Sequence, residues 1–164
     1  MILTIGHSNL SQAEFLALLK QHDVVTLIDV RSKPYSSYSP HFSKRELESA
    51  VNSIGVRYQW EGRMLGGLDA INCADPEFVK AMENVLSLQE LGSVCLMCSE
   101  KNPAACHRAS KLTAWIHTHY SPEQVSTAHI TPNEVLDART FQSQQKPGWS
   151  ELESRTEQLK LDIS

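Results

Sequence analysis

Short strand-like runs alternate along this chain with segments that carry helix signals, and this alternation constrains the fold more than any other feature. The runs lie at residues 2–5, 24–30, 56–60, 93–97 and 124–130. The run at 24–30 is nearly continuous in Val, Leu and Ile, as in a parallel strand that is covered on both faces. Strands that alternate with helices predict a three-layer α/β fold, with a mostly parallel sheet of about five strands and helices on both faces.

The helices between the runs start at recognisable caps. Ser11 with Glu14, and Ser43 with Glu46, have the spacing of capping boxes, which predicts helices ending near residues 21 and 53. An Asp or Asn cap followed by proline predicts two more helix starts, at residues 75 and 102.

Composition indicates one folded domain. The chain has 164 residues, of which 41% are hydrophobic, and no segment approaches the roughly twenty apolar residues of a membrane span. Its start lacks the features of a signal peptide, so we expect a cytoplasmic protein. From Thr140 the sequence turns polar, so we expect an α/β domain over 1–139 and a polar extension over 140–164, in which Ser150 and Glu153 can start a short helix.

The net charge limits the classes of ligand that we expect, and the cysteine content limits the roles of the cysteines. A formal net charge of -4 does not indicate nucleic-acid binding through general phosphate neutralisation, but it leaves room for a small anionic or nucleotide-like ligand in a local basic cleft. In the cytoplasm the four cysteines stay reduced, which favours catalytic or metal-binding roles over disulfides.

Reactive residues follow the ends of several expected strands. Because the carboxyl ends of parallel strands meet at one edge of the sheet, these residues predict a site there. The groups are His7 with Ser8, Asp29 with Arg31, Cys98 with Glu100, and His129.

The segment CSEKNPAACHR, residues 98–108, carries two thiols, a carboxylate, an imidazole and a guanidinium. We place Cys106 in the first turn of the helix that starts at Asn102, where the helix dipole should lower the thiol pKa below about 8.5. Cys98 and Cys106 can approach to metal-ligand distance, which suits zinc or iron. His107 is the third candidate ligand, although it points roughly 100° around that helix from Cys106. The alternative is that both cysteines are buried apolar residues and that Arg108 pairs with Glu100.

Two functional hypotheses use these residues. In the first, the protein is an enzyme: Cys98 or Cys106 is the nucleophile or a metal ligand, and His7 and Glu100 are the acid/base pair. Further roles are that Arg31 and Arg108 clamp an anion and that Asp29 orients a partner such as His7. In the second, the same pocket binds a nucleotide or a nucleic-acid end without catalysis, with Tyr35, Tyr38 or Trp60 stacking on a base.

The motifs TIGHS, LIDVRSKPYS, GVRYQWEGRMLGG and CLMCSEKNPAACHR, taken together, resemble the bacterial and archaeal family known as domain of unknown function 488. The resemblance covers about residues 4–130. It implies an α/β domain with one pocket and leaves the reaction unassigned. The site residues that it implies are His7, Ser8, Asp29, Arg31, Pro34, Ser36, Gly66, Gly67, Cys98, Glu100, Cys106, His107 and Arg108.

A weaker similarity, to the layout of rhodanese-type sulfurtransferases, supplies a third alternative. It consists of Asp29-Val30-Arg31 before a Ser/Tyr/Pro-rich loop, then a late strand, a cysteine and a helix. The loop after Cys98 departs from the glycine-rich cradle of that family. Glu100 would also place a carboxylate where an anionic persulfide should lie.

Overall fold

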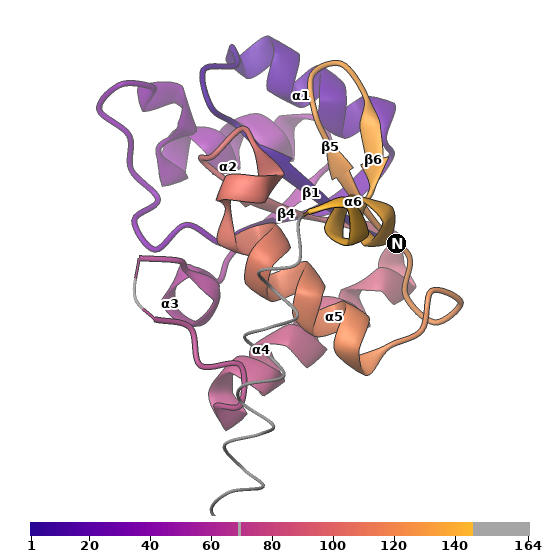
Figure 1. Cartoon of the computed structure of the whole chain (residues 1–164). Helices are drawn as coiled ribbons and strands as arrows, with labels where there is room; N and C mark the ends of the chain where they lie inside the picture. The colour runs from indigo at the N-terminus through magenta and orange to yellow at the C-terminus, as the bar shows by residue number, and fades with distance from the viewer. Residues whose placement is uncertain (69, 146–164) are drawn as a thin grey trace, which may run out of the picture.

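Six strands form one sheet in the computed structural model, which describes residues 1–68 and 70–145 (Figure 1). The strand order is β3-β2-β4-β1-β5-β6. The first five strands are parallel, and β6 pairs antiparallel with β5. The predicted α/β class is therefore confirmed. The strands are β1 (Ile2–Gly6), β2 (Val24–Asp29), β3 (Arg57–Trp60), β4 (Ser93–Cys98), β5 (Thr127–Ile130) and β6 (Val135–Asp137).

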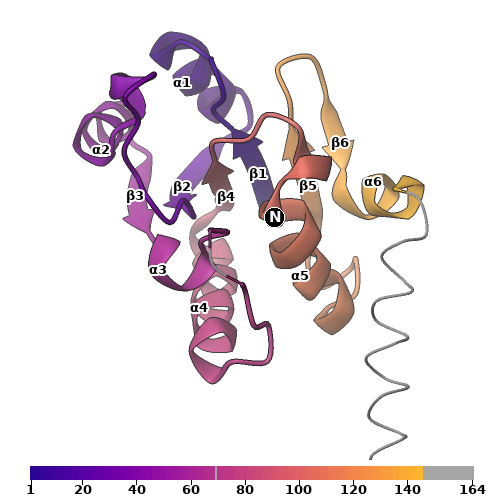
Figure 2. The same ribbon diagram turned by 60° about the vertical axis from the view of Figure 1, so that its left-hand side comes forward.

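The helices connect these strands and cover both faces of the sheet (Figure 2). The α-helices are α1 (Gln12–Gln21), α2 (Lys44–Ser53), α3 (Gly62–Leu65), α4 (Pro76–Ser87), α5 (Ala114–His119) and α6 (Ala138–Gln144). Short 3-10 turns are η1 (Pro40–Phe42), η2 (Leu88–Leu91) and η3 (Pro103–Ala105), and η4 (Arg108–Thr113) is a π-helical segment that continues into α5.

Each face of the sheet has its own hydrophobic core. Alternation along β1 sends Leu3 and Ile5 to one face, where they pack with Phe15 of α1 and Leu47 of α2. Ile2 points to the opposite face, where the core contains Phe78, Met82 and Val85 of α4 and Ile116 of α5. Helices on both sides bury the central strands, including almost all of β2, which explains the nearly continuous apolar sequence of β2.

One of the two predicted capping boxes is present. Ser11 accepts a hydrogen bond from the Glu14 amide, and the Glu14 carboxylate accepts one from the Ser11 amide. The second predicted helix is present as α2, but its predicted capping box is absent, because Ser43 makes no side-chain cap on α2. Its hydroxyl instead accepts a hydrogen bond from the Ser36 amide at 3.4 Å and so fastens the preceding loop.

The C-terminal part of the sheet differs from the expectation. Residues 124–130 were expected to contain the last strand, but the chain turns back and adds β6 as an antiparallel edge. The α6 helix then begins at Ala138 and packs against β5, β6 and η4. The helix expected from Ser150 and Glu153 lies outside the described residues. Within the described part of the chain, no helix has the length and apolar character needed to cross a membrane.

Candidate functional site

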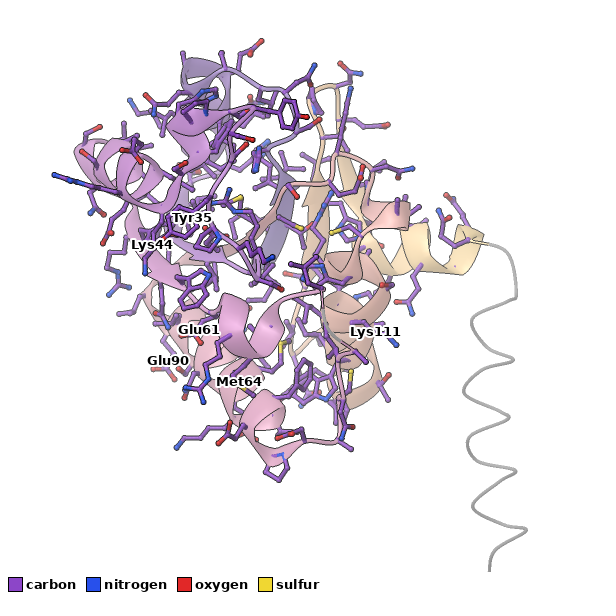
Figure 3. The ribbon with its side chains drawn as sticks, turned by 90° about the vertical axis from the view of Figure 1, so that its left-hand side faces the viewer. Tyr35, Lys44, Glu61, Met64, Glu90 and Lys111 are labelled. Carbon is purple, nitrogen blue, oxygen red and sulfur yellow. The ribbon has the colours of Figure 1, made fainter. Side chains whose placement is uncertain are left out.

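The neighbouring strands β2, β4 and β1 end at the same edge of the sheet, and the residues that follow them form a pocket of about 500 Å³. Tyr35 lines this pocket and is labelled in Figure 3. Lys111, which belongs to η4, is labelled on the other side of the same view. The candidate residues that line the pocket are His7, Arg31, Ser36, Gly67, Cys98, Glu100, Cys106 and His107. The candidates outside its lining are Ser8, Asp29, Pro34, Gly66 and Arg108.

Cys98, Cys106 and His107 form a tight cluster in this pocket. Their candidate ligand atoms all lie within 4.8 Å of one another. The His107 Nδ1 atom is 4.0 Å from the Cys98 sulfur and 3.7 Å from the Cys106 sulfur. Both cysteines are buried. Two thiols and one imidazole at these separations are a donor set that suits zinc.

The backbone between η3 and η4 explains how His107 reaches the two thiols. We expected one continuous helix from Asn102, with His107 turned away from Cys106. The Asn102 cap and Pro103 instead start only a single 3-10 turn, and Cys106 follows it with extended backbone angles, φ -125° and ψ 138°. Cys106 and His107 are therefore not successive positions of one helix, and both side chains turn toward Cys98.

The His107 ring is held in a defined orientation. Its Nε2 atom is 2.9 Å from the Leu65 carbonyl oxygen. Because a carbonyl can only accept, Nε2 carries a proton, and Nδ1 faces the two sulfurs, as an acceptor in the neutral ring and as a donor to the Cys98 thiolate when the ring is protonated. Metal-binding histidines commonly donate their second N–H to a backbone carbonyl in this way.

Gly67 makes room for this ring. A Cβ atom at position 67 would lie 2.5 Å from both Cγ and Nδ1 of His107. The sequence suggested that Gly66 and Gly67 let the backbone approach a ligand. In the structure, Gly67 lets the chain pass against His107, while a Cβ at Gly66 would meet Ser32 and the Gly62 carbonyl.

The two thiols have opposite pKa shifts. The hydrogen bond from the Cys106 thiol lowers the pKa of Cys98 to about 3, with further help from His107 and a backbone bond. The same contact, together with burial, raises the pKa of Cys106 far above its ordinary value. We expected Cys106 to have the lowered pKa, but its extended backbone removes the helix-start position on which that expectation depended.

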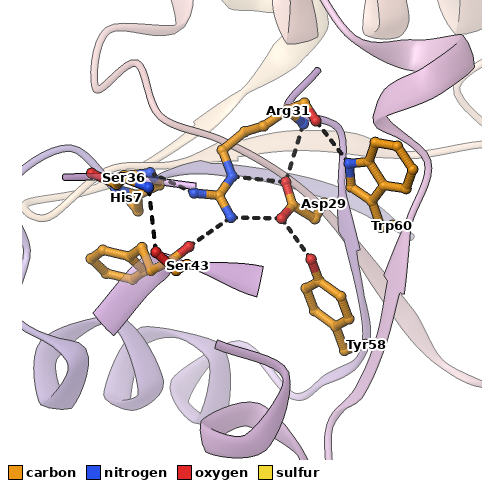
Figure 4. A network of polar contacts seen from close by, with 8 residues as sticks. His7, Asp29, Arg31, Ser36, Ser43, Tyr58 and Trp60 are labelled. Carbon is orange, nitrogen blue, oxygen red and sulfur yellow. Dashed lines mark hydrogen bonds and ion pairs between the residues drawn. The ribbon is translucent and has the colours of Figure 1, made fainter. Parts of the chain in front are cut away.

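Arg31 is held in a buried network at the end of β2 (Figure 4). Its Nε and Nη2 atoms donate to the two carboxylate oxygens of Asp29 at 2.9 and 2.6 Å. The Tyr58 hydroxyl donates to the same carboxylate at 2.7 Å, and Nη2 also donates to the Phe42 carbonyl at 2.8 Å. Asp29 therefore orients Arg31, where we had expected it to orient His7.

Tyr58 is a member of this network that the sequence reasoning missed. The β2–β3 register pairs Tyr58 with Leu27, two residues before Asp29. Alternation along residues 57–60 does group Tyr58 with Trp60, whose ring nitrogen donates to the Arg31 carbonyl at 2.9 Å. The alternation of Tyr58 and Trp60 is visible in the sequence, but it points to Asp29 and Arg31 only once β3 is known to pair with β2.

His7 supports Arg31 at the floor of the pocket. Its Nδ1 atom contacts the Ser8 carbonyl at 3.0 Å, its Nε2 lies 3.3 Å from Arg31 Nη1, and its ring stacks on Phe42. The carbonyl accepts and Arg31 donates, so the ring is neutral with the proton on Nδ1. Burial, and then the Arg31 charge, lower the pKa of His7 to about 4. Glu100 lines the pocket and is exposed, and one of its carboxylate oxygens accepts a hydrogen bond from the Asn102 amide at 2.9 Å.

Arg108 holds the loop between β4 and η4 in place. It is fully buried and donates to the Thr4 hydroxyl at 3.3 Å and to the carbonyls of Glu100 and Lys101. It therefore neither faces the pocket as an anion clamp nor pairs with the Glu100 carboxylate. The loop passes so close to β1 that a Cβ at Gly6 would lie 1.8 Å from the Glu100 carbonyl oxygen.

Tyr35 and Tyr38 also line the pocket, whereas four other residues singled out from the sequence lie outside its lining. Ser8 has a positive φ of 41°, and its hydroxyl donates to Asn9. Cys95 is buried in the core on the α1/α2 face, and burial raises its pKa. Cys73 is only partly buried. His129 contacts the Thr4 hydroxyl at 2.7 Å.

Comparison with known proteins identifies the family. The chain matches the family described as Domain of unknown function DUF488 over residues 11–73 and 70–112, which together make up more than half of its length. The chain belongs to this family. No curated protein and no solved structure matches the chain. Both matched segments of the DUF488 domain contribute to the pocket: the first carries Arg31 and Gly67, and the second carries Cys98 and His107.

Proposed function

We propose that this DUF488 protein is a metal-dependent enzyme in which Cys98, Cys106 and His107 bind zinc. The orientation of His107 carries the proposal, because its Nε2 is fixed on the Leu65 carbonyl while Nδ1 faces both sulfurs at 3.7 and 4.0 Å. In a tetrahedral zinc site the sulfur–nitrogen separation is about 3.6 Å, so the two sulfur–nitrogen distances need to change only by tenths of an ångström. Iron also accepts thiolate and imidazole ligands, but the tetrahedral donor set favours zinc.

Three protein ligands leave a fourth coordination position. All three residues line the pocket, with the two cysteines buried and His107 half-buried. Catalytic zinc sites keep that position for water and lower the pKa of the water to about 7. This chemistry supports hydrolysis. Zinc held by Cys98, Cys106 and His107 would supply a nucleophilic water that could displace a leaving group from an electrophilic carbon or phosphorus, with a nearby base carrying the water proton to the leaving group.

Glu100 is the residue that we assign as this base. It follows Cys98 by two residues, lines the same pocket and is exposed, so its carboxylate can exchange protons with a bound substrate. His7 is less suited to the role that we first gave it, because its Nε2 already accepts from Arg31. In this proposal His7 and Asp29 keep Arg31 in place, and the remaining Nη1 hydrogen of Arg31 donates to an anionic part of the substrate.

Hydrolysis of p-nitrophenyl phosphate and p-nitrophenyl acetate by zinc-loaded protein tests the proposal. Glu100→Gln should lose about 10²- to 10⁴-fold in rate and keep its zinc, because it removes only the proton acceptor. Cys106→Ser should lose both zinc and activity. Cys73→Ser is the matched control, since Cys73 lies outside the cluster, and it should change neither. Equal activity with and without zinc would overturn the proposal.

A further inference from the structure

Exposure along the pocket lining distinguishes a mouth from a floor. Arg31, Cys98 and Cys106 are buried, with 4–8% of their surface accessible, and they form the floor. Tyr35 is 74% exposed and Tyr38 is 99% exposed, and both line the same pocket. Exposed aromatic side chains that gather around one pocket indicate a recognition surface, because single exposed apolar residues are otherwise scattered.

The loop that carries these tyrosines is fastened to its surroundings at several points. The Lys44 amide donates to the Pro34 carbonyl at 2.8 Å, and the Ser39 amide donates to the Ser36 hydroxyl at 2.9 Å. Ser43 accepts from the Ser36 amide, which ties the loop to the start of α2. Two tyrosine rings therefore face solvent from an anchored backbone. Because the loop is already held in place, stacking on a planar ligand costs little entropy for ordering the loop.

The wall between mouth and floor carries a lysine and hydroxyl groups, together with the exposed Glu100 carboxylate. Lys33 lines the pocket and is exposed, and no acidic group among the described residues forms an ion pair with it. Ser36, Ser37 and Ser99 add hydroxyl donors to the same lining. A ligand that suits both regions has a planar ring at one end and an anionic group at the other.

We infer that the substrate is a nucleoside monophosphate unit, bound with its base against Tyr35 and Tyr38 and its phosphate toward Lys33 and Arg31. The inference rests on the proposed function only where it calls the nucleotide a substrate. The contacts to the base and to the phosphate do not involve the metal ligands. A pocket of about 500 Å³ has the size of a small-molecule site. The net charge of -4 favours a free nucleotide over a long strand.

Calorimetric titration of zinc-loaded full-length protein with AMP, adenosine and ribose 5-phosphate tests the inference. AMP should bind more tightly than either fragment. Tyr35→Leu and Tyr38→Leu together should weaken AMP binding by about 5- to 150-fold, the effect of losing the stacking of one base, and should leave ribose 5-phosphate unchanged. Tyr35→Phe with Tyr38→Phe should retain AMP binding, because the rings remain. Lys33→Gln should weaken AMP and ribose 5-phosphate but not adenosine.

A short single-stranded oligonucleotide distinguishes the source of the nucleotide unit. Tighter binding of the oligonucleotide, lost in the same tyrosine variants, identifies a strand end as the ligand. Absence of AMP and oligonucleotide binding at about 1 mM, or equal binding by the leucine variants, would overturn the inference. Zinc content, measured on the same samples, keeps the two claims apart, because loss of nucleotide binding with full zinc occupancy contradicts only the nucleotide assignment.

Discussion

Arg31 places a positive charge in a position that is only 6% exposed, and its surroundings show how the chain compensates for that burial. Asp29 provides a bidentate carboxylate, and the Tyr58 hydroxyl provides a further donor to the same carboxylate. Burying two charges together is tolerated only when their remaining hydrogen-bonding positions are satisfied. At the scale of single residues, therefore, this ion pair is part of the fold as well as of the pocket.

Asp29→Asn should be strongly destabilising, because it leaves the Arg31 guanidinium buried opposite a neutral amide. We expect a loss of about 3–5 kcal/mol in the free energy of unfolding, measured by urea denaturation. Tyr58→Phe is the matched control in the same network, and it should cost about 1.5–3 kcal/mol, the value of one hydrogen bond to a charged group. An Asp29→Asn protein as stable as the Tyr58→Phe protein would contradict this account of Arg31.

Gly67→Ala should disturb the His107 ring without touching either thiol. The added Cβ would lie 2.5 Å from ring atoms of His107, so the ring must turn away from the sulfurs. Changes around a metal-binding histidine typically lower metal affinity by about 10- to 100-fold, and we expect a loss in that range in a competition titration with a zinc indicator. Leu68→Ala, at the next and exposed position, should bind zinc like the unmodified protein. Unchanged affinity in Gly67→Ala would show that His107 is not a ligand.

At the scale of elements, the segment from η3 to η4 decides the geometry of the site. An Asn cap followed by proline starts an α-helix and a 3-10 turn equally well, so the sequence could predict the start at Asn102 but not its termination one turn later. Cys106 is extended and a wide π-helical segment follows it, beginning at Arg108, whose side chain holds the loop to the Thr4 hydroxyl and to the carbonyls of Glu100 and Lys101. Those are tertiary contacts, which explains why the sequence alone predicted that the His107 side chain points away from Cys106.

The edge formed by β5 and α6 contains a histidine that should make stability depend on pH. His129 is 1% exposed, its Nε2 has no hydrogen-bond partner among the described residues, and the Phe141 ring of α6 packs edge-on against it. Burial, and then the Arg108 charge, lower the pKa of His129 to about 4. Between pH 4 and about 6.5 the unfolded chain therefore binds more protons than the folded one, and stability falls as the pH drops through this range.

Burying neutral His129 should cost no stability above about pH 6.5, and protonation of the unfolded chain should remove at most about 3 kcal/mol of stability as the pH falls to 4. Urea denaturation at several pH values measures it. His129→Gln should flatten the dependence without abolishing it, because His7 also has its pKa lowered to about 4 and contributes in the same direction. An identical pH dependence in the two proteins would mean that His129 is not held neutral by the fold.

At the scale of the whole molecule, the strand order explains why residues far apart in sequence meet. With β4 between β2 and β1, the residues after all three strands lie side by side, so His7, Arg31 and Cys98 share one pocket. The alternation of strands and capped helices was enough to predict that the residues after these strands meet at one edge of the sheet, although it did not give the strand order. It was not enough to predict β6, which is three residues long, or the inward turn of Arg108, because side-chain direction is set by packing.

The metal content of the protein, purified without chelator and measured by elemental analysis, tests the central claim most directly. The account predicts about one zinc ion per chain, loss of that zinc in Cys106→Ser, and full retention in Cys73→Ser. Stoichiometric iron in place of zinc would keep the ligand set and change the metal. Absence of any bound metal, or equal occupancy in Cys106→Ser and the unmodified protein, would contradict the assignment of Cys98, Cys106 and His107 as a metal centre.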